Sequence, residues 1–141
     1  MPPSTTIDVR FYELDPYGHV NHGVYLNYFE VARIELLDAI GYGLPRLGEL
    51  GFHLVVVEAR VRFHAPAHAG DRLVVTSTLS RLRRTSAVWD QRLHRGDELI
   101  ATNEVRSGIT DPTGRPTAAP AGLMDALGAL LAPEPTHQES T

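Results

Sequence analysis

The chain has 141 residues and a mass of 15.5 kDa, with 43% hydrophobic and 21% charged residues, which is typical of one globular domain. Its net charge of −4 argues against general affinity for nucleic acid or an anionic membrane surface. It contains no cysteine and no lysine, which excludes disulfides, thiolate nucleophiles, thiolate metal sites and Schiff-base chemistry. Because no apolar run approaches the roughly 18 residues of a membrane span and no secretory segment opens the chain, we expect a cytoplasmic protein.

Both ends of the chain are rich in Pro, Ser, Thr or Glu. We therefore expect a disordered N-terminus at residues 1–5 and a disordered tail at residues 132–141. Nothing between them resembles a linker or an internal repeat. Residues 6–131 are expected to form a single domain.

The first half of the chain predicts one strand and one long helix. Residues 6–12 alternate apolar with polar side chains, which indicates a strand, and a turn-rich stretch then runs to Gly23. Residues 24–40 lack Pro and Gly and carry apolar side chains at helical intervals over most of the circumference, which predicts a buried helix. Gly41 is a helix stop signal, and a Gly- and Pro-rich connection follows at residues 41–51.

The second half predicts β-structure interrupted by turns of Gly, Pro and Asp. Strands are expected at residues 52–63, 72–82, 85–94 and 99–110. We expect a short helix at residues 121–131. An antiparallel sheet that curls around one apolar helix covers both, so the pattern predicts an α+β fold in which five antiparallel strands wrap around one long central helix.

Side chains capable of acyl-transfer chemistry gather just before the central helix and in its first turn. They include the carboxylate of Asp15 and the imidazoles of His19 and His22. The first backbone N–H groups of a helix have no intrahelical partner, and the helix dipole makes that end positive. Such an end can receive the charge that develops on a thioester carbonyl oxygen, while a nearby carboxylate attacks the carbonyl or activates a water.

At these positions the chain resembles the 4-hydroxybenzoyl-CoA thioesterase family of hot-dog-fold acyl-CoA thioesterases. The residues that carry the resemblance are Asp15, Gly18, Val20, Asn21, His22, Tyr25, Tyr28, Glu30 and Arg33. Pro66, Gly70 and Asp71 fit the family's turn between its second and third strands, and Leu14 departs from the threonine common at that position. The similarity extends from about residue 7 to residue 110.

The resemblance implies hydrolysis of an acyl-CoA thioester by a homodimer, assembling into a homotetramer, with active sites between subunits and no cofactor or metal. It implies that Asp15 is the nucleophile or general base. It also implies that the backbone N–H of His22 polarises the thioester carbonyl, with its side chain taking part. The substrate pocket would include Tyr17, Asn21, Gly23, Val24, Tyr25 and Glu30.

Arginines are concentrated in the middle of the chain. Residues 60–95 hold eight Arg and two Asp, a local charge of +6. One interpretation is a solvated face of the sheet. However, Arg81, Arg83 and Arg84 cluster at a predicted hairpin, and guanidinium groups bind phosphates as bidentate donors. Because the resembling family binds the nucleotide near this hairpin, we assign these three arginines to the phosphates of CoA.

Several residues keep a second interpretation. Asp15 precedes a proline and could simply stabilise a turn, and His19 could be an ordinary loop histidine. Glu30 and Arg33 lie three residues apart on the helix, where they could pair with each other or line the site. A metal site at His19 and His22 is disfavoured by the neighbouring glycines and by the lack of a ligand signature.

His64 and His68 flank Pro66, which breaks their helical spacing, so we expect them at the surface or at a sheet edge. Two functional alternatives also stay open. One is a polyketide or fatty-acid pathway thioesterase that acts on acyl groups bound to acyl carrier protein (acyl-ACP). The other is a non-catalytic domain that binds acyl thioesters, although such a domain would not need a base.

Overall fold

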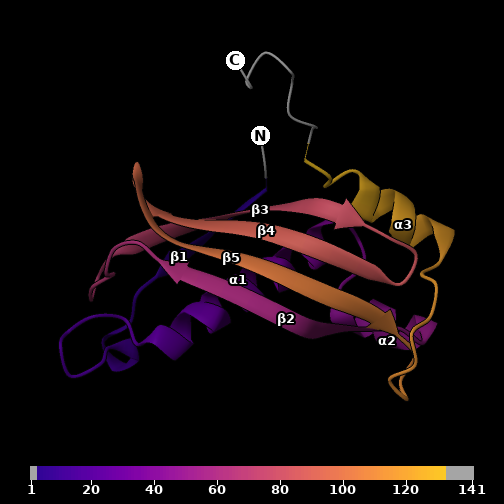
Figure 1. The fold of residues 1–141 in the computed structure, drawn as a ribbon, viewed down its shortest axis with the longest axis horizontal. Helices are drawn as coiled ribbons and strands as arrows, with labels where there is room; N and C mark the ends of the chain where they lie inside the picture. The colour runs from indigo at the N-terminus through magenta and orange to yellow at the C-terminus, as the bar shows by residue number, and fades with distance from the viewer. Residues whose placement is uncertain (1–2, 133–141) are drawn as a thin grey trace, which may run out of the picture.

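The computed structural model, which describes residues 3–132, contains one antiparallel sheet with the strand order β1-β3-β4-β5-β2, and helix α1 lies against one face (Figure 1). The strands are β1 (Ser4–Asp8), β2 (His53–Phe63), β3 (Arg72–Leu82), β4 (Ser86–Arg95) and β5 (Glu98–Thr110). The helices are η1 (Phe11–Glu13, a 3-10 turn), α1 (His22–Ala39), α2 (Leu44–Leu50) and α3 (Ala121–Gly128). The predicted α+β fold, five antiparallel strands around one long helix, is confirmed.

Helix α1 buries one face and exposes the other. Its buried side chains, which face the sheet, are Tyr25, Tyr28, Phe29, Ala32, Leu36 and Leu37. On the other side Leu26 is 45% exposed and Val31 is 43% exposed. The expectation that this helix is buried over most of its circumference is therefore wrong for a single chain, because one sheet covers only one side of a helix.

The core divides into two clusters along α1. One surrounds the first half of the helix and includes Tyr25, Phe29, Leu73, Leu93 and Ile100. The other surrounds its second half and includes Leu36, Leu47, Leu79, Trp89, Leu123 and Leu127. Helices α2 and α3 close this second end of the sheet, and the segment that precedes α1 lies at the opposite end (Figure 1).

The N-terminal strand is shifted from its predicted place. Ser4 and Thr5 pair with Thr76 and Val75 of β3, so the expectation of disorder is wrong for these two residues. The strand ends at Asp8 because the chain then turns away, and the next segment forms η1 instead of continuing the strand predicted to residue 12. The expectation of disorder is also wrong for Pro3, whose carbonyl accepts the Ser77 N–H at 3.0 Å, and for Ala132, whose N–H donates to the Leu79 carbonyl at 2.8 Å. Residues 1–2 and 133–141, where the rest of the terminal predictions fall, lie outside the described residues.

Helix α2 was not expected, because Gly and Pro suggested a loop at residues 41–51. Pro45 lies in the first turn, where its missing N–H is no cost, and Gly51 ends the helix with a φ of 84°. Leu47, 1% exposed, anchors the helix in the core. Strands β2 to β5 lie within one residue of their predicted bounds, α1 begins two residues early, and α3 ends three residues early.

Candidate active site

Asp15 lies in a tight loop that a β-bridge between Leu14 and Val20 closes. Its Oδ1 accepts the backbone N–H of Tyr17 at 2.8 Å and that of His19 at 3.2 Å. Gly18, whose φ is 79°, lets the loop reverse and donates its N–H to the Asp15 carbonyl at 3.0 Å. Asp15 thus stabilises the turn through Oδ1, while Oδ2 takes no part in the turn.

The amino end of α1 directly follows this loop. The Oδ1 of Asn21 accepts the Gly23 N–H at 3.0 Å, and the Asn21 carbonyl accepts the Val24 N–H at 2.9 Å. Neither contact uses the N–H of His22. This group therefore lies at the positive end of the helix outside the cap, as a donor for an incoming acceptor.

The loop and the start of α1 face one wide cleft of about 330 Å³. Its lining residues come from the loop, from α1 and from the end of β2 and are Asp15, His19, Val20, His22, Tyr25, Phe63, His64, Ala65 and Pro66. Of the predicted site residues, the structure brings together Asp15, His22 and Tyr25. His19 and His64, which we expected to be a loop residue and a surface residue, also line the cleft.

Tyr25 forms an apolar wall of the cleft. Its side chain is 3% exposed, its hydroxyl oxygen accepts the Ala67 N–H at 3.3 Å, and its ring meets the Phe63 ring edge-on with 5.1 Å between centroids. Burial raises the pKa of Tyr25, against smaller opposing effects of the Ala67 N–H and of Arg95. The phenol is therefore neutral near pH 7 and cannot act there as a base.

Glu13 fixes the segment that precedes the loop. Its Oε1 accepts the Tyr28 hydroxyl at 2.8 Å and the Arg10 N–H at 2.8 Å, and its carbonyl accepts the Asn21 N–H at 2.9 Å. Burial, with the adjacent carboxylate of Glu13, raises the pKa of Tyr28 well above its usual value. Glu13 thus ties η1 to the start and to the second turn of α1, on either side of the loop that holds Asp15.

The turn between β2 and β3 supports the other side of the loop. His19 forms a β-bridge with His68, and the two rings meet edge-on at 5.2 Å. Asp71 Oδ2 accepts the His68 N–H at 2.8 Å and pairs with Arg95 at 2.6 Å. Burial alone would raise the pKa of Asp71, but the His68 N–H and Arg95 together hold it below its usual value.

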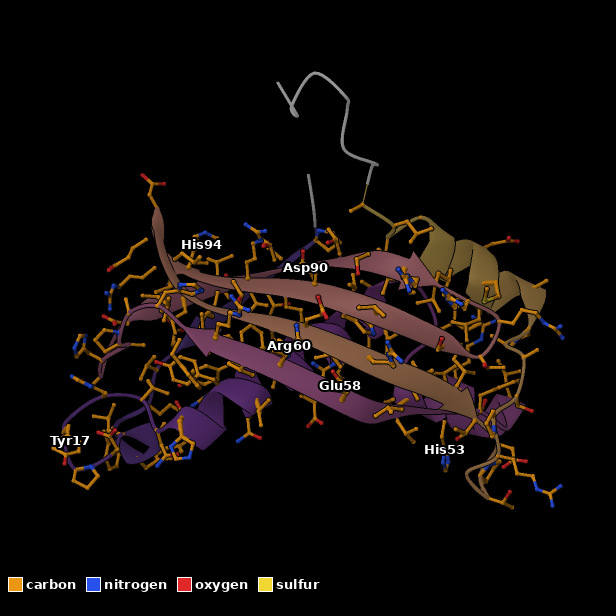
Figure 2. The ribbon with its side chains drawn as sticks, viewed as in Figure 1. Tyr17, His53, Glu58, Arg60, Asp90 and His94 are labelled. Carbon is orange, nitrogen blue, oxygen red and sulfur yellow. The ribbon has the colours of Figure 1, made fainter. Side chains whose placement is uncertain are left out.

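Other predicted pocket residues lie away from the cleft. Tyr17 is 85% exposed at the outer tip of the loop (Figure 2). Asn21 caps α1, and Gly23 and Val24 lie in its first turn, but none of the three lines the cleft. Glu30 is exposed further along the helix, where it lines two cavities between α1 and β2. Among residues 3–132 it forms no salt bridge with Arg33, which donates to Gln91 at 2.9 Å.

The arginines predicted to bind CoA lie at the far end of the sheet. Arg83 donates its N–H to Ser86 at 2.8 Å in the β3–β4 hairpin, and Ser86 is aligned through Gly108 with Val55 of β2. The cleft lies at Phe63, eight residues and about 26 Å further along β2. Arg81 and Arg84 share this far end, so one chain does not bring the arginine cluster and the cleft together.

Other arginines of the basic stretch lie on the sheet face turned away from α1. There Arg60, Arg62 and Arg92 surround a shallow depression together with Asp90 and Glu104. Figure 2 shows Arg60 and Asp90 on this face. The solvated-face interpretation therefore describes these arginines.

Two further properties concern metals and membranes. Across residues 3–132, no group of three or more His, Asp or Glu side chains is arranged to hold a metal ion. Within the same range, no helix combines the length and the apolar composition needed to span a lipid bilayer.

Comparison with known proteins gives matches along nearly all of the described chain. The model of the thioesterase-like superfamily matches residues 9–127. The chloroplast acyl-acyl carrier protein thioesterase ATL2 of Arabidopsis thaliana is 31% identical over 86% of this chain, which spans only 66% of that protein's length. The acyl-CoA thioester hydrolase YbgC of Escherichia coli O6:H1 is 28% identical over 84% of this chain and 90% of its own.

A solved structure also matches most of the chain. A thioesterase of Thermus thermophilus, complexed with coenzyme A and Zn, is 31% identical to this chain. It superposes with a TM-score of 0.78 and covers 90% of this chain and 92% of its own.

Proposed function

The chain belongs to the thioesterase-like superfamily, and we propose that it hydrolyses the thioester bond of an acyl-CoA to release a free acid and CoA. The observation that carries this proposal is the single cleft that the Asp15 carboxylate shares with His22 at the amino end of α1. Within the superfamily we assign the chain to the 4-hydroxybenzoyl-CoA thioesterase family. This assignment rests on the sequence between Asp15 and Arg33.

In the proposed reaction, Asp15 acts through Oδ2 as general base or as nucleophile. Its other oxygen is held by two backbone N–H groups, which orients the carboxylate before substrate binds. With Asp15 as base, a water loses its proton to Oδ2 and attacks the carbonyl carbon. The C–S bond then breaks, and the departing CoA thiolate takes up that proton.

The amino end of α1 stabilises the charge that builds on the carbonyl oxygen. The His22 N–H and the helix dipole favour negative charge at this end, and a preformed donor needs no reorganisation during the reaction. We assign the His22 imidazole a second hydrogen bond to the same oxygen. The first carbons of the acyl group pack against the apolar wall formed by Tyr25. Asn21, Gly23 and Val24 shape the turn beside this wall.

A second copy of the chain completes the site. Strand β2 is an edge strand with exposed Val56 and Val57, and an exposed apolar edge favours pairing with another strand. Antiparallel pairing of two β2 strands about a twofold axis places the His53 end of one beside the Phe63 end of the other. The hairpin with Arg83 then approaches the partner's cleft, where it can bind the phosphates of CoA.

The carrier of the acyl group has one alternative with support of its own. The similarity to a plant acyl-acyl carrier protein thioesterase favours a substrate held on a carrier protein. Presenting the same acyl group on CoA and on acyl carrier protein decides between them. A large excess of kcat/KM for the carrier-bound form would replace CoA in the proposal.

The proposal is tested by measuring thiol release from a panel of acyl-CoAs with Asp15→Asn. We expect kcat to fall on the order of 10²–10⁴-fold, because the amide can neither take up a proton nor attack. Asp125→Asn, a matched change at an exposed position of α3, should keep full activity and the same thermal unfolding. Undiminished hydrolysis by Asp15→Asn would refute its role, and tight binding of acyl-CoA without thiol release by the unaltered protein would favour a binding domain.

A further inference from the structure

A groove runs between α1 and β2, beyond the proposed catalytic cleft. Its first part, about 210 Å³, begins one helical turn after His22, at Leu26, and includes Ala59 of β2. A second part, about 100 Å³, continues toward Leu54 and Trp89. The two parts share Arg33, Glu30 and Val56, so an ion of each sign lies at the middle of the groove beside its aliphatic wall.

A hydrogen-bond network beneath α1 fixes the polar groups of this groove. Gln91, 0% exposed, donates from Nε2 to the Phe29 carbonyl at 2.9 Å and to Ser77 Oγ at 3.1 Å. A carbonyl only accepts, so the orientation of the Gln91 amide is determined. Its Oε1 is therefore the acceptor that faces Arg33 and Asn103, and it accepts from Arg33 Nη1 at 2.9 Å and from Asn103 Nδ2 at 3.4 Å.

The orientation of Asn103 follows from the same chain of bonds. Because its Nδ2 donates to Gln91, its Oδ1 is the atom left over, and this oxygen is buried without any hydrogen-bond partner. Asn103 itself is 1% exposed and lines the 210 Å³ part of the groove. Across residues 3–132 it is the only buried side-chain polar atom in this state. Native proteins rarely leave such an atom unpaired.

We propose that Asn103 and Arg33 recognise a hydroxyl group on an aliphatic acyl chain that lies in this groove. The inference rests on the proposed function and names its substrate class. A hydroxyl both donates and accepts, so it can donate to Asn103 Oδ1 while it accepts from the Arg33 guanidinium. A keto or carboxylate oxygen would leave Oδ1 without a donor, and a methylene would leave both groups unpaired.

The network also locates the hydroxyl along the chain. Gln91 is bonded to the Phe29 carbonyl, seven residues after His22, which corresponds to about 10 Å along the helix axis. An extended chain advances about 3.3–3.6 Å per three bonds, so roughly eight or nine bonds cover this distance. The hydroxyl therefore lies about eight carbons from the thioester carbonyl, and the part of the groove at Leu54 and Trp89 receives the remaining alkyl tail.

Three matched substrates test the inference. They are dodecanoyl-CoA, the same chain with a hydroxyl about eight carbons from the carbonyl, and β-hydroxydodecanoyl-CoA. We expect kcat/KM for the mid-chain hydroxyl to exceed that for dodecanoyl-CoA on the order of tenfold, because two hydrogen bonds are gained in a buried setting. The β-hydroxyl lies too close to the thioester to reach the network and should give no gain.

Variants separate this role from a structural one. Asn103→Leu removes Oδ1 at similar side-chain volume and should reduce the preference for the mid-chain hydroxyl to about onefold. Arg33→Met should do the same, and Asn103→Gln should recover part of it. Ser77→Ala is the control, because Ser77 bonds the same Gln91 but lines a different cavity, between α1 and β1, and should keep the preference.

Binding measurements keep the inference testable without turnover. The Kd of each of the three acyl-CoAs for Asp15→Asn, measured by calorimetry, should show the same order. Equal Kd values, equal kcat/KM values, or a preference that survives in Asn103→Leu would overturn the inference and leave the proposed hydrolysis intact. Absence of thiol release from every acyl-CoA, together with a preserved Kd preference, would overturn the hydrolysis and leave the recognition site.

Discussion

At the residue scale, the proposed site depends on the different surroundings of the two carboxylate oxygens of Asp15. One oxygen satisfies the loop that carries the residue, and the other stays outside the loop. The structural and the chemical interpretations of this aspartate are therefore compatible. The loop in turn rests on Asp71, whose partner His68 is joined by a β-bridge to His19.

Asp71→Asn should weaken folding in a pH-dependent way. The pKa of Asp71 is lower in the folded protein than its ordinary value of 3.8, so its charge stabilises the fold above that pH, and the stabilisation is lost as the pH falls through the folded value. Near pH 7 we expect the free energy of unfolding to fall by about 1–2 kcal/mol. Urea unfolding at several pH values measures it, and the difference from the unaltered protein should shrink below pH 3.8.

Exposed Asp97, changed to Asn, provides the control for this comparison, since no partner among the described residues pairs with it. A difference in unfolding free energy for Asp71→Asn that stays constant from pH 7 to below pH 3.8 would contradict a charge effect. It would point instead to lost packing of the side chain.

The sequence was sufficient to predict that Asp15, His22 and Tyr25 lie close together, because all three precede or begin a strongly patterned helix, while their roles stay predictions. It could not place Glu13 or His64. Glu13 bonds Tyr28 fifteen residues away, and His64 follows a strand whose position beside α1 is set by pairing with β5. Neither contact leaves a local pattern in the chain.

At the element scale, α2 contains one glycine and is ended by another, and the two are expected to affect the stability of the helix in opposite ways. Gly51 ends the helix in the left-handed region, with a φ of 84°. Gly48 lies inside the helix with ordinary helical geometry. An added Cβ would meet nothing within 4 Å at either position, so backbone conformation alone decides the outcome.

Gly51→Ala should lower the free energy of unfolding by about 1–2 kcal/mol, because an L-residue is strained in the left-handed region. Gly48→Ala should raise it by about 0.5–1 kcal/mol, because alanine favours a helix. Thermal unfolding of the two variants measures both effects. Equal shifts of the same sign would contradict the described end of α2.

The elements themselves were predictable where one periodicity dominated. Alternation over ten or more residues gave β2 to β5, and helical spacing gave α1. Helix α2 was missed because its stability comes from Leu47 in the core rather than from its Gly- and Pro-containing sequence. The predicted strand at residues 6–12 was too long because apolar Phe11, which is 80% exposed, continues the alternation without continuing the strand.

At the scale of the whole molecule, the residues of the proposed site lie at the two ends of one sheet. The cleft with Asp15 and the hairpin with Arg83 and Arg84 cannot meet within a chain. No sequence pattern could reveal this separation, because it depends on the strand order and on the direction of β2. The proposed pairing of two β2 edges would bring the cleft of one chain near the hairpin of the other.

Mixed dimers test this arrangement. Arg83→Gln combined with Arg84→Gln should raise KM for acyl-CoA, and Asp15→Asn should abolish turnover. When the two variants are co-expressed and the heterodimer is isolated, one of its two sites has an intact Asp15 and intact arginines from opposite chains. We expect half of the normal activity at a normal KM.

A site built within one chain would give a different result. The heterodimer would then show only the raised KM of the arginine variant. A protein that stays monomeric in sedimentation at assay concentrations would likewise contradict the paired β2 edges.

Helix α1 carries both His22, which we propose to bind the carbonyl oxygen, and Arg33, about three turns further along the same helix. The distance between His22 and Arg33 is consequently constant, since both residues lie on the same helix. To recognise a substituent elsewhere on the acyl chain, the protein would need a polar side chain one or more turns away on α1, in increments of about 5.4 Å. The positions on α1 at which a substituent of the acyl chain can be recognised are therefore spaced about one helical turn apart.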